Sequence, residues 1–273
     1  MTYKSILVHV DDDKNCATRL DLALKLATSF EAYLTGLHVV PPAYVPPYMA
    51  AELGTQIFET QRRLATQLAI DAENMFKKAV NQYEVQFEWR RDDGYPGEVV
   101  STHARYSDLA VVGQNEPEKG NDVAETVVLD SGRPTLVVPY AGRFERIGER
   151  ILVAWNAGRE ATRAVGDALP LLKRAKSVTV MAVNPTGGPA AHGDVPGADI
   201  SLYLARHGVN AEATQVFAED IDVGAMLLSR AADLGSDLLV MGAYGRSRLT
   251  ELVLGGATRH ILQQMTIPVL MSH

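Results

Sequence analysis

The chain repeats its own strand pattern, and this duplication limits the folds open to it more than any other feature. Three short runs of the first half return in the same order in the second half. The pairs are KSILVHV (4–10) and ERILV (149–153), SDLAVVG (107–113) and SDLLVMG (236–242), and RPTLVVP (133–139) and TIPVL (266–270). A length of 273 residues is enough for two domains of ordinary size. We therefore expect two copies of one structural unit.

The strand segments within these runs, such as ILVHV, DLAVVG and TLVVP, are continuous apolar stretches and do not alternate with polar residues. That pattern is typical of strands covered on both faces of a parallel sheet. Between them, residues 161–172 carry apolar side chains at helical spacing, with Pro170 expected to kink or end the helix. Residues 59–80 predict a longer helix. Strands that alternate with helices predict an α/β fold of two tandem, open, parallel-sheet domains of Rossmann-like type.

A polar segment at residues 140–149 has neither strand nor helix periodicity, and we expect the domain boundary there. The predicted domains are residues 1–142 and 148–273. Loops rich in proline or glycine follow the second strand of each half, at 41–54 and 184–197. Because open α/β sheets bind ligands at the carboxyl ends of their strands, these loops border the expected ligand crevices.

A glycine-rich loop follows the strand LLVM of the second half. Its glycines are spaced as one glycine, two residues, a second glycine, nine residues and then a glycine pair. Glycines at a strand end allow a sharp turn and a close approach to a ligand, and the helix that follows offers free N–H groups to an anion such as phosphate. The spacing is neither GxGxxG nor a Walker A loop, so a P-loop NTPase is not expected. The loop residues are Gly242, Gly245, Arg246, Ser247, Gly255 and Gly256.

The duplicated strands and this G-x2-G-x9-G loop resemble the universal stress proteins, in a tandem form that covers nearly the whole chain. The resemblance implies an adenine nucleotide α-hydrolase-like fold in which the loop holds the phosphates of ATP. It also implies that the last strands, 135–139 and 267–271, pair within the chain and relate the two halves by a pseudo-twofold axis. Both strands are apolar and would otherwise be exposed edges.

Carried over residue by residue, the resemblance assigns a nucleotide site to the second half. Gly242, Gly245 and Gly255 match the family loop, whereas Gly256 stands where the family has a serine or threonine. Asn156 stands where the family has an aspartate that contacts the nucleoside. Val183 ends the second strand and is expected to line the adenine pocket.

The first half shows the opposite pattern. Asp11 occupies the position of the family aspartate, but the loop after Gly113 lacks the glycine spacing. Glu116 and Glu118 of that loop would repel phosphate. We expect the first domain to be degenerate for nucleotide binding.

The expected function is therefore that of a stress-response regulator that binds ATP or AMP in its second domain, with Mg²⁺ as a candidate companion of the phosphates. No catalytic residues are assigned, and any hydrolysis is expected to be slow. A scaffold or partner-binding protein that has lost nucleotide binding is the alternative, because Gly256 and Asn156 both depart from the family. A synthetase-type enzyme of the wider superfamily would need an SGGxDS-type loop, which neither half contains.

Charge and composition limit the kinds of partner and the compartment that we expect for the chain. A net charge of −7 disfavours nucleic acid, and no apolar run is long enough to cross a membrane. The single cysteine, Cys16, excludes an intrachain disulfide and favours the cytoplasm. The family resemblance adds a homodimer of tandem chains.

A few polar residues outside the loop have simpler expected roles. No histidine pair has metal-ligand spacing, so no metal site is predicted. His9 and His38 lie on neighbouring predicted strands and could face one cavity, although buried neutral imidazoles with backbone partners are the simpler expectation. The run Asp11–Asp13 could bind Mg²⁺ but is expected to cap the helix that begins near Cys16.

Overall fold

The computed structural model describes residues 2–43, 55–115, 122–185, 197–217, 221–244 and 256–273. Its strands are β1 (Ser5–His9), β2 (Tyr33–Val40), β3 (Phe87–Asp93), β4 (Leu109–Gly113), β5 (Thr135–Val138), β6 (Arg150–Ala154), β7 (Ser177–Val183), β8 (Ala211–Val216), β9 (Leu238–Gly242) and β10 (Val269–Ser272). Its helices are α1 (Cys16–Phe30), α3 (Thr55–Val80), α4 (Pro96–Ala104), α5 (Val123–Asp130), α6 (Arg159–Leu172), α7 (Ala198–Arg206), α8 (Val223–Asp233) and α9 (Gly256–Gln264).

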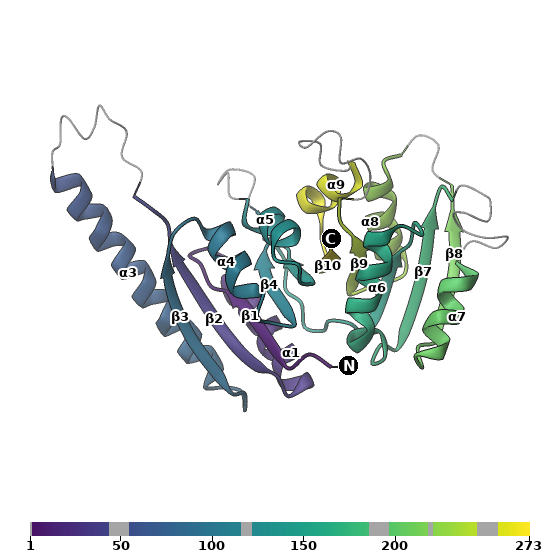
Figure 1. Ribbon diagram of the computed structural model, residues 1–273, viewed down its shortest axis with the longest axis horizontal. Coiled ribbons are helices and arrows are strands. Elements are labelled where there is room, and N and C mark those ends of the chain that lie inside the picture. The colour runs from purple at the N-terminus through teal and green to yellow at the C-terminus, as the bar shows by residue number, and fades with distance from the viewer. Residues whose placement is uncertain (1, 44–54, 116–121, 186–196, 218–220, 245–255) are drawn as a thin grey trace.

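The strands of both halves form one open sheet in the order β3-β2-β1-β4-β5-β10-β9-β6-β7-β8 (Figure 1). Each half contributes five strands that pair in parallel. The halves meet where β5 and β10 pair antiparallel, with Leu136 opposite Leu270. This pairing confirms the predicted pseudo-twofold arrangement, because both apolar edge strands are covered by each other.

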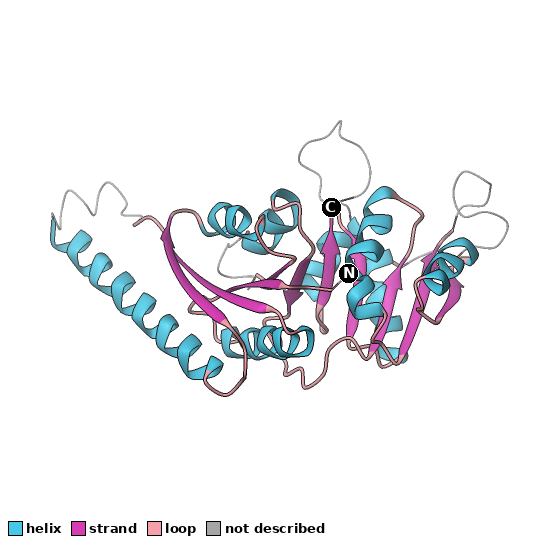
Figure 2. Cartoon of the chain, turned by 60° about the horizontal axis from the view of Figure 1, so that its bottom comes forward, coloured by secondary structure: helices cyan, strands magenta, loops and turns pink. Residues whose placement is uncertain are grey.

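Helices cover both faces of the sheet (Figure 2). One apolar core packs α1, α3, α6 and α7 against one face, and a second packs α4, α5, α8 and α9 against the other. Equivalent helices of the two halves therefore lie on the same face. Burial on both sides explains why β4 and β9 are apolar at every position. No helix among the described residues is long and apolar enough to cross a membrane.

The repeated Ser-Asp-Leu motif has a structural role in each half. Asp108 accepts hydrogen bonds from the backbone N–H groups of Lys4 and Ser5, at 2.7 and 3.0 Å. Asp237 does the same for Gly148, Glu149 and Arg150, at 2.9–3.1 Å. These carboxylates tie the amino end of the first strand of each half to the start of its fourth strand.

Both helices predicted from periodicity are present and slightly longer than expected. The helix predicted at 59–80 begins at residue 55, and the one predicted at 161–172 begins at residue 159. Pro170 lies inside the last turn of α6, which ends two residues later at Leu172. Its ring cannot donate to the carbonyl of Gly166 and crowds it, so the proline disturbs only the last turn of the helix.

Candidate functional site

A cavity of about 200 Å³ opens at the carboxyl ends of β6, β7 and β9 in the second half. The first turns of α6, α8 and α9 close it from the sides through Ala161, Val223 and Ala257. Three helix amino termini thus border one cavity. The positive dipole ends of these helices favour an anion there.

The residues predicted for this site divide into two groups. Asn156, Val183, Gly242 and Gly256 all line the cavity, although they are distant in sequence. The fold brings them together because they end β6, β7 and β9 or begin α9. The remaining four predicted residues, Gly245, Arg246, Ser247 and Gly255, lie outside the described residues.

Gly242 is required by packing. A Cβ atom at this position would lie 2.5 Å from the backbone N of Ala161 and 2.5 Å from the carbonyl carbon of Glu160. Real Cβ atoms do not approach backbone that closely, so only glycine lets the first turn of α6 lie against β9. The glycine therefore shapes one wall of the cavity.

Asn156 is exposed at the cavity mouth. Its Oδ1 accepts a hydrogen bond of 2.9 Å from the backbone N of Gly158. This bond fixes which end of the amide is committed to the protein. The Nδ2 group remains as a hydrogen-bond donor at the cavity mouth, in a position where a carboxylate could not donate.

Three non-glycine residues that follow the lining residues of this cavity have left-handed backbone conformations. Ala157, Asn184 and Tyr244 have φ values of 57°, 47° and 60°. Each follows the carboxyl end of a strand of the second half, β6, β7 or β9 respectively. Non-glycine residues in this conformation cost roughly 1–3 kcal/mol each and gather at functional sites. Glu31, at the end of α1, is the only such residue described in the first half.

A carboxylate lies beside the amino terminus of α9. Asp222 caps α8, because its Oδ1 accepts from the backbone N of Gly224 at 2.8 Å and of Ala225 at 3.3 Å. Its Oδ2 lies 3.7 Å from the point where a Cβ on Gly256 would stand. The Nδ1 atom of His260 lies 3.5 Å from the Oδ1 atom of Asp222. The phosphate end of the predicted site thus combines a helix terminus with a negative neighbour.

Sequence reasoning missed several lining residues. Trp155, Met181 and Met241 contribute apolar surface from strand ends, where their pattern resembles ordinary core. Thr258 also lines the cavity, and its Oγ1 accepts a 3.3 Å hydrogen bond from the backbone N of Tyr244. The hydroxyl two residues after Gly256 was the available signal for Thr258.

In the first half, the place at the end of β4 that corresponds to Gly242 is filled. Arg19 of α1 is almost fully buried and forms a 2.5 Å ion pair with Asp11. A Cβ on Gly113 would collide with the Arg19 guanidinium, and the cavity beside these residues measures only about 10 Å³. Burial alone would raise the pKa of Asp11, but the charge of Arg19 and its hydrogen bond lower it to about 2. A fixed carboxylate and guanidinium therefore fill the first-half crevice beside Gly113.

Two features were expected of His9 and His38, a shared cavity and burial, and the structure has both. They line one cavity of the first half, and both are nearly fully buried. The Nδ1 of His38 donates to the carbonyl of Val10 at 2.8 Å. Burial lowers the pKa of His9 to about 4, despite Asp11 at 3.5 Å, so its imidazole is neutral near pH 7.

The expected capping of α1 by the aspartate run is wrong. Asn15 is the N-cap residue, and its side chain makes no capping hydrogen bond. Asp11 instead binds Arg19 and accepts from the backbone N of Asp13 at 3.1 Å. The buried guanidinium of Arg19 needs a counter-charge, so the carboxylate of Asp11 pairs with it and does not cap the helix. Within the described parts of the chain, no group of three or more metal-ligating side chains is assembled.

Comparison with solved structures supports the fold. A universal stress protein from Archaeoglobus fulgidus DSM 4304 superposes with a TM-score of 0.74 at 14% identity, over 98% of this chain and 95% of that one. A putative universal stress protein from Pseudomonas aeruginosa UCBPP-PA14 gives a TM-score of 0.60 at 14% identity, over 99% and 93%. A universal stress protein in complex with cAMP is 20% identical over 52% of this chain and all of its own, with a TM-score of 0.37.

Comparison with curated proteins gave no significant match. The universal stress protein family, however, matches the sequence twice, at residues 2–139 and at residues 148–273. These two matches coincide with the two halves of the sheet, which meet at β5 and β10. The chain therefore belongs to the universal stress protein family and carries two family units in tandem.

Proposed function

We propose that the chain binds an adenine nucleotide, ATP or AMP, in the cavity of the second half and acts by binding, as a stress-response regulator. The observation that carries this proposal is the open crevice in which Asn156, Val183 and Gly256 meet at the ends of three helices. The first half has the same strands, but Arg19 fills the place beside Gly113 that corresponds to the part of the crevice beside Gly242. A relative solved in complex with cAMP is consistent with a nucleotide of this class.

The base and the phosphates of the nucleotide would occupy different ends of the cavity. Its volume of about 200 Å³ is below the ~300–1,000 Å³ of a typical small-molecule pocket. It would hold the base beside Val183 and Met181, with Asn156 Nδ2 as a donor to a ring nitrogen or the ribose. The phosphates would lie at the mouth, against the amino terminus of α9.

Mg²⁺ would arrive with the phosphates, because the described residues assemble no protein cage for a metal. Asp222 is the nearest described carboxylate to Gly256 and would be the single protein ligand of the Mg²⁺ ion. Binding Mg²⁺ through one carboxylate and substrate phosphates is usual for this ion. Hydrolysis, if measured, is expected to be slow.

Calorimetric titration of ATP tests the proposal. Gly245→Val should abolish or strongly weaken binding, because a β-branched side chain would obstruct the approach of the loop to phosphate. Gly120→Val changes a glycine in the equivalent loop of the first half and should leave the affinity unchanged. Thermal unfolding of both variants separates loss of binding from loss of fold.

A wild-type protein that shows no heat with ATP, ADP or AMP would overturn the proposal. The scaffold alternative would then replace it, and two observations already favour that alternative locally. The Oδ1 of Asn156 is used by the protein itself, and the carboxylate of Asp222 lies where phosphate is expected.

We also propose that the protein works in the cytoplasm as a homodimer of tandem chains. Light scattering across micromolar concentrations tests the second part. A mass near 59 kDa is expected for two chains of 29.6 kDa, and a constant mass near 30 kDa would contradict it.

A further inference from the structure

A second cavity, of about 910 Å³, lies in the first half between α3 and the carboxyl ends of β2 and β3. We call it the α3 cavity. Its helical wall includes Phe58, Arg62 and Leu68, and its sheet wall includes Val40 and Arg91. Its volume lies in the range of pockets that hold small organic ligands.

The cavity exists because only half of α3 packs on the sheet. The buried residues of the helix all lie in its carboxyl-terminal half: Ala69, Ala72, Phe76 and Val80. Phe76 lies so close to Gly36 of β2 that a Cβ there would be 2.5 Å from the phenyl ring. Toward its amino terminus the helix diverges from the strands (Figures 1 and 2). The result is a wedge that is closed at one end by an aromatic side chain.

The diverging half of α3 keeps an apolar surface. Phe58 is 47% exposed and Leu64 is 59% exposed, and both line the cavity. Val39, Val40 and Pro41 extend the apolar surface at the end of β2. An apolar ligand in the wedge would cover these side chains and gain the free energy of removing their surface from water.

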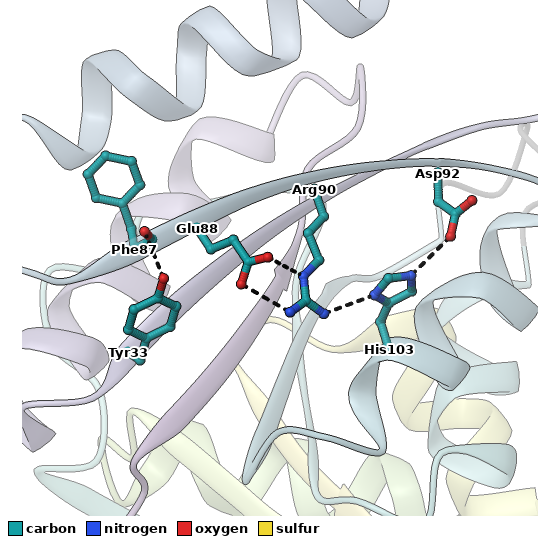
Figure 3. A network of polar contacts seen from close by, with 6 residues as sticks. All are labelled: Tyr33, Phe87, Glu88, Arg90, Asp92 and His103. Atoms are coloured by element: carbon teal, nitrogen blue, oxygen red, sulfur yellow. Dashed lines mark hydrogen bonds and ion pairs between the residues drawn. The ribbon is translucent and has the colours of Figure 1, made fainter.

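The sheet wall also places a cation at the cavity. In the β2–β3 register, His38 lies beside Arg91, and side chains in register share one face. Neither Arg91 of β3 nor Arg62 of α3 has an ion-pair partner among the described residues. The neighbouring Arg90, on the other face of β3, is fully engaged: it forms bonds of 2.7 and 3.0 Å to Glu88 and contacts His103 (Figure 3).

The carboxylates at the cavity do not cancel this positive pair. Asp11 is neutralised by the buried Arg19. Asp12 and Asp93 are exposed, as are Arg62 and Arg91, so all four side chains keep contact with water. A guanidinium is more weakly hydrated and binds a carboxylate through two parallel hydrogen bonds. An anionic group would therefore find its strongest partners at Arg62 and Arg91.

We propose that the α3 cavity binds a small organic anion with an apolar body, such as a medium-chain carboxylate. The apolar part lies between α3 and β2, and the charged group lies between Arg62 and Arg91. This site lies in the other half of the sheet from the nucleotide crevice. It borders Asp11 and Val39, which correspond to Asn156 and Val183, whereas Arg19 fills the place beside Gly113. It would give the two halves different ligands.

The test uses the full chain and the fluorescent sulfonate 1-anilinonaphthalene-8-sulfonate as the probe. We expect saturable binding that dodecanoate displaces and that ATP does not. Dodecanol and dodecyltrimethylammonium, which have the same chain with no charge or a positive charge, should displace the probe at least about tenfold less well. An unchanged near-ultraviolet circular dichroism spectrum excludes binding to a loosened core.

Matched variants test the charge assignment. Arg62→Ala and Arg91→Ala should each weaken dodecanoate binding about tenfold and leave dodecanol unchanged. Arg63→Ala removes the same charge from the next residue of α3, which is not among the lining residues, and should have little effect. Phe58→Asp should weaken the binding of both dodecanoate and dodecanol.

Several outcomes would overturn the proposal. They are an absence of saturable probe binding, displacement by ATP, preference for the cationic chain, or equal effects of Arg62→Ala and Arg63→Ala. A doubled mass in light scattering that Phe58→Asp reduces to one chain would show that a second copy covers this face instead.

Discussion

Arg19 in the first half and Ala164 in the second occupy equivalent positions, eight residues after Asp11 and Asn156 respectively. The guanidinium of Arg19 separates α1 from Gly113 and fills the crevice at the end of β4. In the second half, the first turn of α6 lies directly on Gly242, and a cavity of about 200 Å³ remains beside it.

The difference explains the charge at the end of each first strand. A buried guanidinium requires a buried carboxylate, because an unpaired charge in the protein interior is costly. Asp11 is therefore committed to Arg19 and is not available to a nucleoside. Asn156 has no such cation to neutralise and keeps an uncharged donor at an open cavity. The same strand position thus serves stability in one half and, we propose, a ligand in the other.

The largest expected effect comes from breaking the buried pair. Arg19→Met leaves Asp11 without its counter-charge and should lower the free energy of unfolding by about 3–5 kcal/mol in urea denaturation. The double variant with Asp11→Asn should recover part of that loss. Arg163→Met, on the equivalent helix α6 but half exposed, should cost less than about 1 kcal/mol. Equal effects at residues 19 and 163 would contradict the assigned role of Arg19.

The second effect is a pH dependence that belongs to the first half. The unfolded chain protonates His9 near pH 6.5, whereas the folded chain resists protonation until about pH 4. Stability should therefore fall as pH drops from about 6.5 to 4, by about 2–4 kcal/mol from this residue. The lowered pKa of Asp11 adds a further loss as pH falls from about 4 toward 2.

Urea denaturation between pH 4 and 7 measures the His9 contribution. His9→Gln should flatten the profile over this interval, and the exposed His207→Gln should not. A profile that keeps its slope in His9→Gln would show that another group dominates.

A third effect separates the two strand-end glycines. Gly242→Ala places a methyl group against backbone of α6 and should cost about 1–3 kcal/mol, whether or not Arg19 is present. Gly113→Ala meets the Arg19 side chain, so its cost should largely disappear in the Arg19→Met background. A double-mutant cycle by urea denaturation measures both. Identical coupling of both glycines to residue 19 would contradict the account.

The smallest effect concerns the carboxylate beside α9. Asp222→Asn keeps the oxygen that caps α8 but removes the charge near Gly256, so ATP should bind about 2–10 times more tightly without Mg²⁺. Adenosine, which has no phosphate, should bind unchanged. Asp233→Asn at the exposed end of α8 is the control. Calorimetry in which adenosine gains as much as ATP would place the phosphates elsewhere.

Much of the fold was predictable because strand repeats report burial. The runs 109–113 and 238–242 are apolar at every position, and the pairing of the last strands follows from their exposed edges. The outer strands were harder to predict. β3 reads FEWRRDD and β8 reads AEATQV, since strands at the sheet edges carry charged and polar side chains on exposed positions.

The candidate site was predictable only where it follows from strand ends. The positions of Asn156, Val183 and Gly242 are set by the strands that precede them. The role of Arg19 was not predictable, because an arginine in a helix is usually solvated and only tertiary packing buries it. Similarly, the helical periodicity of residues 59–80 is the same whether or not a sheet lies beneath, so it could not reveal the α3 cavity.

Hydrogen exchange measured with and without ATP tests the central claim most directly, because it locates the nucleotide without any substitution. We expect ATP to slow exchange at the amino ends of α6, α8 and α9 and to leave α1, α4 and α5 unchanged. Protection at the amino ends of the first-half helices, or equal protection in both halves, would contradict the assignment of the nucleotide to the second half.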